Sequence, residues 1–310
     1  MKDRPGITVF TPVFNRKHTI DRPFDSLMRQ TCKDFEWLVI DDGSTDGIKE
    51  TIDLFIEKAD FSVRYYYKEN GGKHTAMNMA AGLANGGYFL VLDSDDALTD
   101  NAVESIFALW GGIPEHGREK YWCVTGLCVD SQTGKIIGDQ YPEGINQQAN
   151  PKLLAQKTTG DKTGCIRTDI LLDYPFPEPA GTNFITESII WNKIDKSYSQ
   201  YYSNEILKVV YLNEPDSLTA VWFKEHVREG YVSNYCWKLS TLNDIGIHKP
   251  KDCRILFTVP YYGLMAGKKR NEIIGAVQKP VYKTLVAMLM VPAGVFKVIR
   301  GNRHIKNIQP

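Results

Sequence analysis

The chain has 310 residues, of which 43% are hydrophobic and 24% charged, and its formal net charge is zero. This is the composition of an ordinary globular protein, so it excludes an intrinsically disordered chain and leaves room for one large domain or two small ones. The six cysteines are irregularly spaced without a Cys-x-x-Cys pair, which argues against a disulfide framework or a zinc site. No apolar leader precedes the first expected strand, so we expect no secretory signal and a cytoplasmic protein.

Apolar runs alternate with helical patterns over the first third of the chain. Strand-like runs occupy residues 7–10, 35–40, 63–67 and 88–92. Helical patterns cover residues 18–30, 48–58, 75–84 and 102–110. Strands that alternate with helices predict right-handed crossovers and an α/β fold with a parallel sheet. Because no long linker or repeat appears, we expect one main domain over residues 1–225 and a C-terminal extension over residues 226–310.

Three carboxylates follow the fourth expected strand within four residues, at Asp93, Asp95 and Asp96. Such neighbours repel one another, and a hard divalent cation with phosphate oxygens is the usual means of neutralising them. This pattern indicates a metal and nucleotide site. The alternative is that these residues only form a turn or cap a helix, since a strand end is a normal place for Asp.

Polar loops also follow the three earlier strands, at Thr11-Pro12, at 41–44 and at 70–73. In an open parallel sheet the carboxyl ends of the strands form the crevice in which ligands bind, so these loops are expected to meet there. Asp42 can accept a hydrogen bond from a nucleobase N–H, which suits the imide of uracil. Its alternative role is in a tight turn of the sequence Asp-Asp-Gly-Ser.

The remaining loop residues have roles that match a diphosphate and its metal. Lys73 follows two glycines and can place a positive charge beside phosphate oxygens, although Gly-Gly-Lys is also a common solvated turn. Asp93 can reach ribose hydroxyls, and Asp95 is the better candidate for direct coordination of Mg²⁺ or Mn²⁺. Asp96 is expected to coordinate the same ion or to support it.

Four ordered segments of the chain resemble the family 2 glycosyltransferases: Val9–Arg16, Gln30–Trp37, Val39–Asp46 and Leu92–Asp96. The resemblance implies a GT-A type fold, with a Rossmann-like, mostly parallel central sheet flanked by helices, followed here by a helical C-terminal extension. It implies that Asp42 binds the base and that Asp93-Ser94-Asp95 is the metal-binding Asp-x-Asp. Together with the loop chemistry, this predicts a metal held by Asp95 and Asp96. The predicted nucleotide-sugar site consists of Thr11, Pro12, Asp42, Lys73, Asp93, Ser94 and Asp95.

The family carries an acidic pair before an apolar helix, and the second acid serves as the catalytic base. Residues 185–191 fit that position, with Thr186 in place of the first acid and Glu187 as the candidate base. An inverting transferase needs such a carboxylate to take the proton from the attacking hydroxyl. The alternative is that Glu187 only favours a helix N-terminus electrostatically.

The combined reading is an inverting, metal-dependent transferase that moves a sugar from a nucleotide diphosphate donor, expected to be UDP-linked, to a glycan or lipid-linked acceptor. The resemblance favours bacterial surface polysaccharide synthesis as the setting. A sugar nucleotidyltransferase is the second enzymatic hypothesis. A glycine-rich loop after the first strand would favour it, but Thr11-Pro12-Val13 stands there instead. A non-catalytic nucleotide-sugar-binding protein is the third. We expect no nucleic-acid partner, because the predicted sheet region is acidic.

The C-terminal region is strongly basic. Residues 251–310 hold eleven Lys or Arg against two acidic residues, a net charge of +9. Within it, residues 284–296 are uncharged but fall short of the ~20 residues that span a bilayer, and Pro292 interrupts them. Two readings stay open: peripheral association of residues 280–306 with the inner face of the cell membrane, or a core helix with a solvated basic face.

Overall fold

The computed structural model describes residues 4–212, 227–247 and 250–306. Contacts divide the chain into two compact units, each built from two stretches of sequence. The first unit comprises the described residues of Met1–Pro175 and Ile194–Glu214, and the second those of Phe176–Lys193 and Pro215–Pro310. The domain boundary expected at 225/226 lies outside the described residues and remains a prediction.

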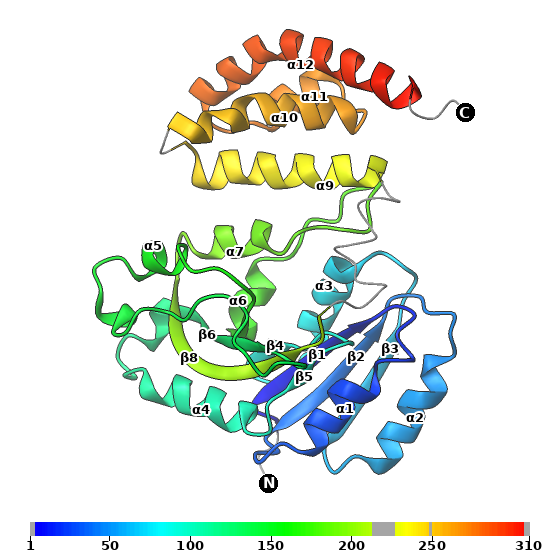
Figure 1. Cartoon of the computed structure of the whole chain (residues 1–310), viewed down its shortest axis with the longest axis vertical. Helices are drawn as coiled ribbons and strands as arrows, with labels where there is room; N and C mark the ends of the chain where they lie inside the picture. The colour runs from blue at the N-terminus through cyan, green and yellow to red at the C-terminus, as the bar shows by residue number, and fades with distance from the viewer. Residues whose placement is uncertain (1–3, 213–226, 248–249, 307–310) are drawn as a thin grey trace. The chain divides into compact units, whose positions relative to one another are not determined.

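A sheet of eight described strands forms the centre of the first unit (Figure 1). Its strands are β1 (Ile7–Val13), β2 (Phe35–Asp41), β3 (Ser62–Tyr67), β4 (Tyr88–Val91), β5 (Ala97–Leu98), β6 (Tyr121–Asp130), β7 (Lys162–Arg167) and β8 (Ser199–Val210). They lie in the order β3-β2-β1-β4-β7-β6-β8-β5. The predicted parallel sheet is confirmed for β1 to β4. Beyond β4 the sheet is mixed, because β7 runs antiparallel to β4 and β6, and β5 runs antiparallel to β8.

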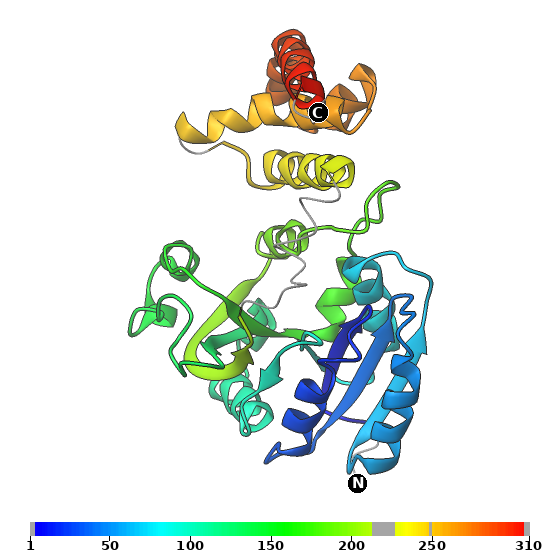
Figure 2. The same cartoon turned by 45° about the vertical axis from the view of Figure 1, so that its right-hand side comes forward.

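Helices cover both faces of this sheet (Figures 1 and 2). They are α1 (Asp21–Met28), α2 (Ile48–Lys58), α3 (Lys73–Leu83), α4 (Ala102–Gly112), α5 (Pro151–Ala155) and α6 (Thr168–Asp173), with short 3₁₀ turns at Arg118–Lys120 and Ile145–Gln147. Helices α1, α2 and α4 share one hydrophobic cluster with the sheet. Helix α3 contacts β1 and β2 and packs against α6. The α/β architecture expected from the sequence is confirmed.

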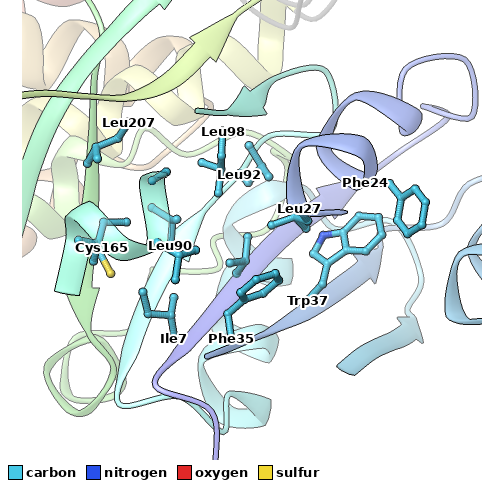
Figure 3. Close-up of a cluster of buried hydrophobic side chains, with 14 of the residues drawn as sticks. Ile7, Phe24, Leu27, Phe35, Trp37, Leu90, Leu92, Leu98, Cys165 and Leu207 are labelled. Carbon is cyan, nitrogen blue, oxygen red and sulfur yellow. The ribbon is translucent and has the colours of Figure 1, made fainter. Parts of the chain in front are cut away.

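The core under α1, α2 and α4 is rich in aromatic side chains (Figure 3). Phe24 of α1 stacks on Phe55 of α2 with ring centroids 4.0 Å apart, and Trp37 of β2 lies beside both rings. Alternate residues of a strand point to opposite faces, so Ile7 and Val9 face this cluster from β1. The buried rings hold the parallel strands rigidly, and their carboxyl ends therefore give the loops that follow a firm base.

Gln30 joins the end of α1 to the start of α4. Its amide nitrogen donates to the carbonyl oxygens of Ser26 and Thr99, at 3.0 and 2.8 Å, and its amide oxygen accepts from the Val103 N–H at 3.1 Å. One buried side chain thus satisfies an otherwise unpaired donor in the first turn of α4. It also ties α1 to the segment that follows the carboxylate turn.

The described part of the second unit is helical, as expected of a helical extension. It contains α7 (Ser188–Ile194, except for its last residue), α9 (Val227–Ser240), a π-helical turn (Thr241–Ile245), a 3₁₀ turn (Pro250–Cys253), α10 (Arg254–Met265), α11 (Arg270–Ala276) and α12 (Pro280–Lys306). Its core joins side chains from α9 to α12, among them Tyr235, Val259, Ile273 and Met290. Among the described helices, none is both long and apolar enough to cross a membrane.

Candidate functional site

A tight turn gathers the three neighbouring carboxylates at the carboxyl end of β4. The Leu92 N–H still bonds to the Phe10 carbonyl of β1, and the chain then reverses through an Asp96 N–H bond to the Asp93 carbonyl at 3.2 Å. Strand β5 starts immediately afterwards at Ala97 and pairs with β8. Asp93, Asp95 and Asp96 therefore belong to one turn at the end of a buried strand, where Asp is also a common turn former.

Two lysines neutralise two of these carboxylates. Lys73 is the first residue of α3, and its Nζ lies 2.6 Å from Asp93 Oδ1. The Lys208 Nζ lies 3.4 Å from Asp93 Oδ2 and 2.9 Å from Asp96 Oδ2. The sequence predicted Lys73 but not Lys208. The only signal for Lys208 in the sequence is a lone charge inside the otherwise apolar run 206–210.

These ion pairs decide the protonation of the cluster. Burial opposes ionisation of Asp93, but Lys73 and Lys208 outweigh it and hold the pKa of Asp93 well below its usual range. Burial would also lower the pKa of Lys208, yet the charges of Asp93 and Asp96 raise it well above the usual value for lysine. The ammonium and the Asp93 carboxylate are therefore both charged at neutral pH.

Asp95 has different surroundings. Among the residues that the structure describes, no cation forms an ion pair with its carboxylate, and burial together with the charge of Asp93 raises its pKa. The backbone carbonyl of Asp95 accepts a hydrogen bond from Arg22 at 3.1 Å, and the Arg22 guanidinium lies 4.1 Å from the centroid of the Tyr211 ring. The turn is held firmly while this carboxylate has no ion-pair partner among the described residues, which fits a group that takes a cation.

No complete metal cage is present in the described part of the chain, where no three His, Cys, Asp or Glu side chains come together in a way that could hold an ion. This is compatible with Mg²⁺, which proteins commonly bind through one or two carboxylates together with substrate phosphates. Asp96 is not oriented as an open ligand, because its Oδ2 faces Lys208 and its Oδ1 accepts from the Tyr211 N–H at 3.3 Å. The residues therefore fit a divalent cation held mainly by Asp95.

The two adjacent aspartates at the end of β2, Asp41 and Asp42, have separate roles. Asp41 closes its own turn, since its carboxylate accepts from the Ser44 N–H at 2.8 Å and from the Tyr65 hydroxyl at 2.6 Å. Burial and the Asp41 carboxylate raise the pKa of Tyr65, so this hydroxyl stays protonated and donates. Asp41 thus has the turn-forming role that the sequence left open for one member of the pair.

Asp42 organises the loop after β3. Its Oδ1 accepts from the Lys68 ammonium at 2.6 Å and from the Gly71 N–H at 2.9 Å, and its Oδ2 accepts from the Gly72 N–H at 2.6 Å. Gly43 lets the loop at Asn70 come close to the backbone that follows Asp42. Its φ is +89°, and a Cβ at this position would lie only 2.8 Å from the backbone nitrogen of Asn70. Gly72 and Lys73 are adjacent, so this loop connects Asp42 to the Lys73–Asp93 pair.

The other predicted residues of the first unit lie nearby in the sheet. Thr11 is buried, and its hydroxyl accepts from the Trp37 indole N–H at 2.9 Å, so its described contact is internal. Pro12 pairs with Ile40 in the β1–β2 register, and Ser94 is buried in the carboxylate turn. Phe14 follows β1 directly and is 48% exposed.

Glu187 belongs to the second unit, where it immediately precedes α7. Its carbonyl oxygen accepts from the Ile190 and Trp191 N–H groups, at 3.0 and 3.2 Å, and so begins the helix. Thr186, which stands where the family has an acid, lies with its hydroxyl 3.1 Å from that of Ser188. The role of Glu187 as a base remains a prediction.

Comparison with known proteins agrees with this geometry. Residues 8–116 match the family described as Glycosyl transferase family 2. The GalNAc(5)-diNAcBac-PP-undecaprenol beta-1,3-glucosyltransferase of Campylobacter jejuni is 24% identical over 309 residues, covering 95% of this chain and 93% of that protein.

Solved structures of low sequence identity have the same fold. TarS of S. aureus in complex with UDP-GlcNAc aligns with a TM-score of 0.59 at 16% identity, over 94% of this chain and 88% of that one. The mannosyltransferase PcManGT from Pyrobaculum calidifontis, in complex with GDP-Man and Mn²⁺, aligns with a TM-score of 0.52 at 16% identity, over 97% and 85% of the two chains. The GT-A type fold expected from the sequence is confirmed.

Proposed function

This chain belongs to glycosyl transferase family 2 through residues 8–116, and we propose that it transfers a sugar from a UDP-linked donor to a lipid-linked glycan with inversion at the anomeric carbon. The observation that carries this proposal is the turn 93–96, where Asp95 lacks an ion-pair partner among the described residues beside a lysine-bound Asp93. In an open α/β sheet such a turn lies where ligands bind, at the carboxyl end of the parallel strands.

The loops around this turn support a nucleoside diphosphate as the donor. Lys73 brings a positive charge to the site, and the loop that precedes it is held by Asp42. Each carboxylate oxygen has two lone pairs, so Asp42 Oδ2, which accepts one described hydrogen bond, can accept another from the imide of uracil. Asp93, with 31% of its side chain exposed, is available to ribose hydroxyls. Thr11, Pro12 and Ser94 complete the proposed nucleotide-sugar site.

Mn²⁺ or Mg²⁺ is the proposed cofactor. Asp95 would hold it, and the bound ion would supply positive charge to the diphosphate as it leaves. Asp96, named by the sequence as a second ligand, is engaged with Lys208 instead. PcManGT has been solved with Mn²⁺. Metal use by this chain is an extension from that protein's fold and from the chemistry of the turn.

Glu187 is the proposed base. An acceptor hydroxyl oxygen attacks the anomeric carbon, the bond from that carbon to the diphosphate oxygen breaks, and the hydroxyl proton passes to the Glu187 carboxylate. The diphosphate leaves as UDP, and Lys73 lies where it can offset the charge that develops. Attack opposite the leaving group inverts the anomeric configuration.

The proposed acceptor comes from the Campylobacter jejuni relative, whose name specifies an undecaprenyl diphosphate-linked glycan. A polyprenyl-linked acceptor lies in a membrane, so the enzyme must work at a lipid surface. Synthesis of a bacterial surface polysaccharide or glycan is the corresponding setting. The apolar side chains that α12 exposes, among them Met288 and Val291, support peripheral attachment at the inner face of the cell membrane.

A direct assay distinguishes this proposal from its alternatives. The purified chain would be incubated with Mn²⁺, a panel of UDP- and GDP-sugars and a polyprenyl diphosphate-linked glycan, and the products followed by mass spectrometry. We expect an acceptor enlarged by one sugar and release of UDP. Formation of a nucleotide sugar and pyrophosphate from a sugar phosphate and a nucleoside triphosphate would indicate a nucleotidyltransferase. Donor binding without any turnover would indicate a non-catalytic binding protein.

A further inference from the structure

Lys208 is a buried lysine, with 11% of its side chain exposed, between two carboxylates of the turn 93–96. Its ammonium lies 2.9 Å from Asp96 Oδ2 and 3.4 Å from Asp93 Oδ2. Its backbone is fixed, because Lys208 pairs with Leu98 in the β5–β8 ladder directly after the turn. The second oxygen of Asp96 accepts the Tyr211 N–H just after β8. Both oxygens of Asp96 are therefore committed to β8 and the residue that follows it.

We propose that Lys208 is a positioning residue that withholds Asp96 from the metal and leaves Asp95 as the one carboxylate of the turn open to it. The inference rests on the proposed metal-dependent transfer. A divalent cation that approached Asp96 would meet a fixed ammonium about 3 Å from the same oxygen, and the repulsion between them is strong in a partly buried site. One open carboxylate is a poor site by itself. Metal binding then depends on the diphosphate, and the ion is held only when the donor is present.

Mn²⁺ binding to the donor-free protein tests this directly, by isothermal titration calorimetry or electron paramagnetic resonance. Lys208→Met keeps the length of the side chain but removes its charge. We expect donor-free Mn²⁺ affinity to rise by about tenfold or more, because Asp96 loses its counter-ion and can join Asp95, whereas Asp93 stays paired with Lys73. Lys208→Arg, the matched control, keeps the charge and should bind Mn²⁺ as weakly as the native chain.

Asp96→Asn separates positioning from direct ligation. In the native background this substitution should leave donor-free Mn²⁺ affinity unchanged, since Asp96 is not a ligand there. In the Lys208→Met background it should remove most of the gained affinity. Weaker Mn²⁺ binding by the single Asp96→Asn variant, or no gain in folded Lys208→Met, would overturn the proposal.

Lys208→Met leaves the buried Asp96 carboxylate without its cation, which lowers stability. Thermal unfolding with and without Mn²⁺ therefore serves as a second measurement. The melting temperature of Lys208→Met should fall without metal and rise more with Mn²⁺ than that of the native chain. If Lys208→Met does not fold, donor-free Mn²⁺ binding by the single Asp96→Asn variant decides whether the proposal stands. If native protein with UDP binds no Mn²⁺ while Lys208→Met does, the role of Lys208 stands and metal-dependent transfer fails.

Discussion

The carboxylate of Asp95 differs from those of Asp93 and Asp96 in having no ion-pair partner among the described residues. Burial raises the pKa of both Asp95 and Asp96, so what distinguishes them is the ion pair that Lys208 makes with Asp96 and not with Asp95. The sequence predicted the residue through its Asp-x-Asp spacing. Its distinction from Asp96 depends on Lys208, which the sequence marks only as a lone charge in the apolar run 206–210.

Replacing Asp95 by Asn should abolish turnover and Mn²⁺-dependent UDP binding without unfolding the protein, because a crowded carboxylate loses repulsion when it is neutralised. Calorimetry of UDP binding with and without Mn²⁺ measures the effect. Asp100→Asn is a matched control, since Asp100 pairs with Arg29 on the surface five residues further along. Metal-dependent UDP binding that persists in folded Asp95→Asn would exclude Asp95 as the ligand.

Glu187→Gln keeps the size and hydrogen-bonding capacity of the side chain but cannot accept the acceptor's proton. We expect kcat to fall by about 10²- to 10⁴-fold while the affinity for the donor barely changes. Glu178→Gln changes an exposed residue of the same 176–193 segment and should leave kcat unaltered. Donor affinity that falls in step with kcat would instead assign Glu187 to donor binding or to helix formation at α7.

Local sequence patterns predicted the strands of the first half of the sheet, β1 to β4. The expected strands at 7–10, 35–40, 63–67 and 88–92 became β1 to β4, because each is a continuous apolar or aromatic run between polar loops. The helix expected over 18–30 is shorter, Asp21–Met28. The mixed half, β5 to β8, was not predicted, since its pairings join residues far apart in sequence, such as Leu98 with Lys208.

Glu36 shows how one residue joins several elements at the opposite end of the strands. It is buried in β2, and its carboxylate accepts from the Thr8 hydroxyl, from Arg64 and from both the backbone and side-chain nitrogens of Asn85, at 2.7 to 3.1 Å. Burial opposes ionisation, but these donors outweigh it and lower the pKa of Glu36. The carboxylate thus connects β1, β2, β3 and the segment before β4.

Glu36→Gln should lower the free energy of unfolding by about 1–3 kcal/mol at neutral pH, because hydrogen bonds to a charged acceptor are lost or weakened. A lowered folded-state pKa means that the unfolded chain binds the proton more readily. The contribution is therefore complete above the ordinary glutamate pKa of about 4.3 and is lost as the pH falls through the folded-state value. Urea unfolding from pH 7 to pH 3 should show the unfolding free energies of Glu36→Gln and the native chain converging in acid.

Glu57→Gln, at an exposed position on α2, is the control and should have the unfolding free energy of the native chain at every pH. A constant difference between Glu36→Gln and the native chain across this range would contradict the assigned cause.

Charge is divided unevenly along the whole chain, with +9 in residues 251–310 and therefore −9 in residues 1–250. Helix α12 packs Val286 and Met290 into the core of the second unit, and its Ala293 is also buried. Its other face exposes apolar side chains at helical spacing: Val281, Leu285, Met288, Val291 and Val295. The sequence left a membrane anchor and a core helix as alternatives, and the described part of α12 has both a packed face and an exposed apolar face.

The exposed stripe and the basic residues near it, Lys279 and Lys283, suit a helix that lies on an anionic lipid surface. Vesicle co-sedimentation tests this. Intact protein should bind vesicles that contain anionic lipid at low salt, and high salt should release part of it by screening.

The double substitution Met288→Glu and Val291→Glu should weaken vesicle binding by about tenfold or more, because each change removes an inserted apolar side chain and adds a repelled charge. Both positions are strongly exposed, at 67% and 65%, so the fold should tolerate them. Leu54→Glu places the same charge on an exposed site of α2 and should not reduce binding. No binding of the intact chain to anionic vesicles at low salt would dispose of the lipid assignment. Concentration-dependent self-association abolished by the double substitution would assign the stripe to a second copy of the chain instead.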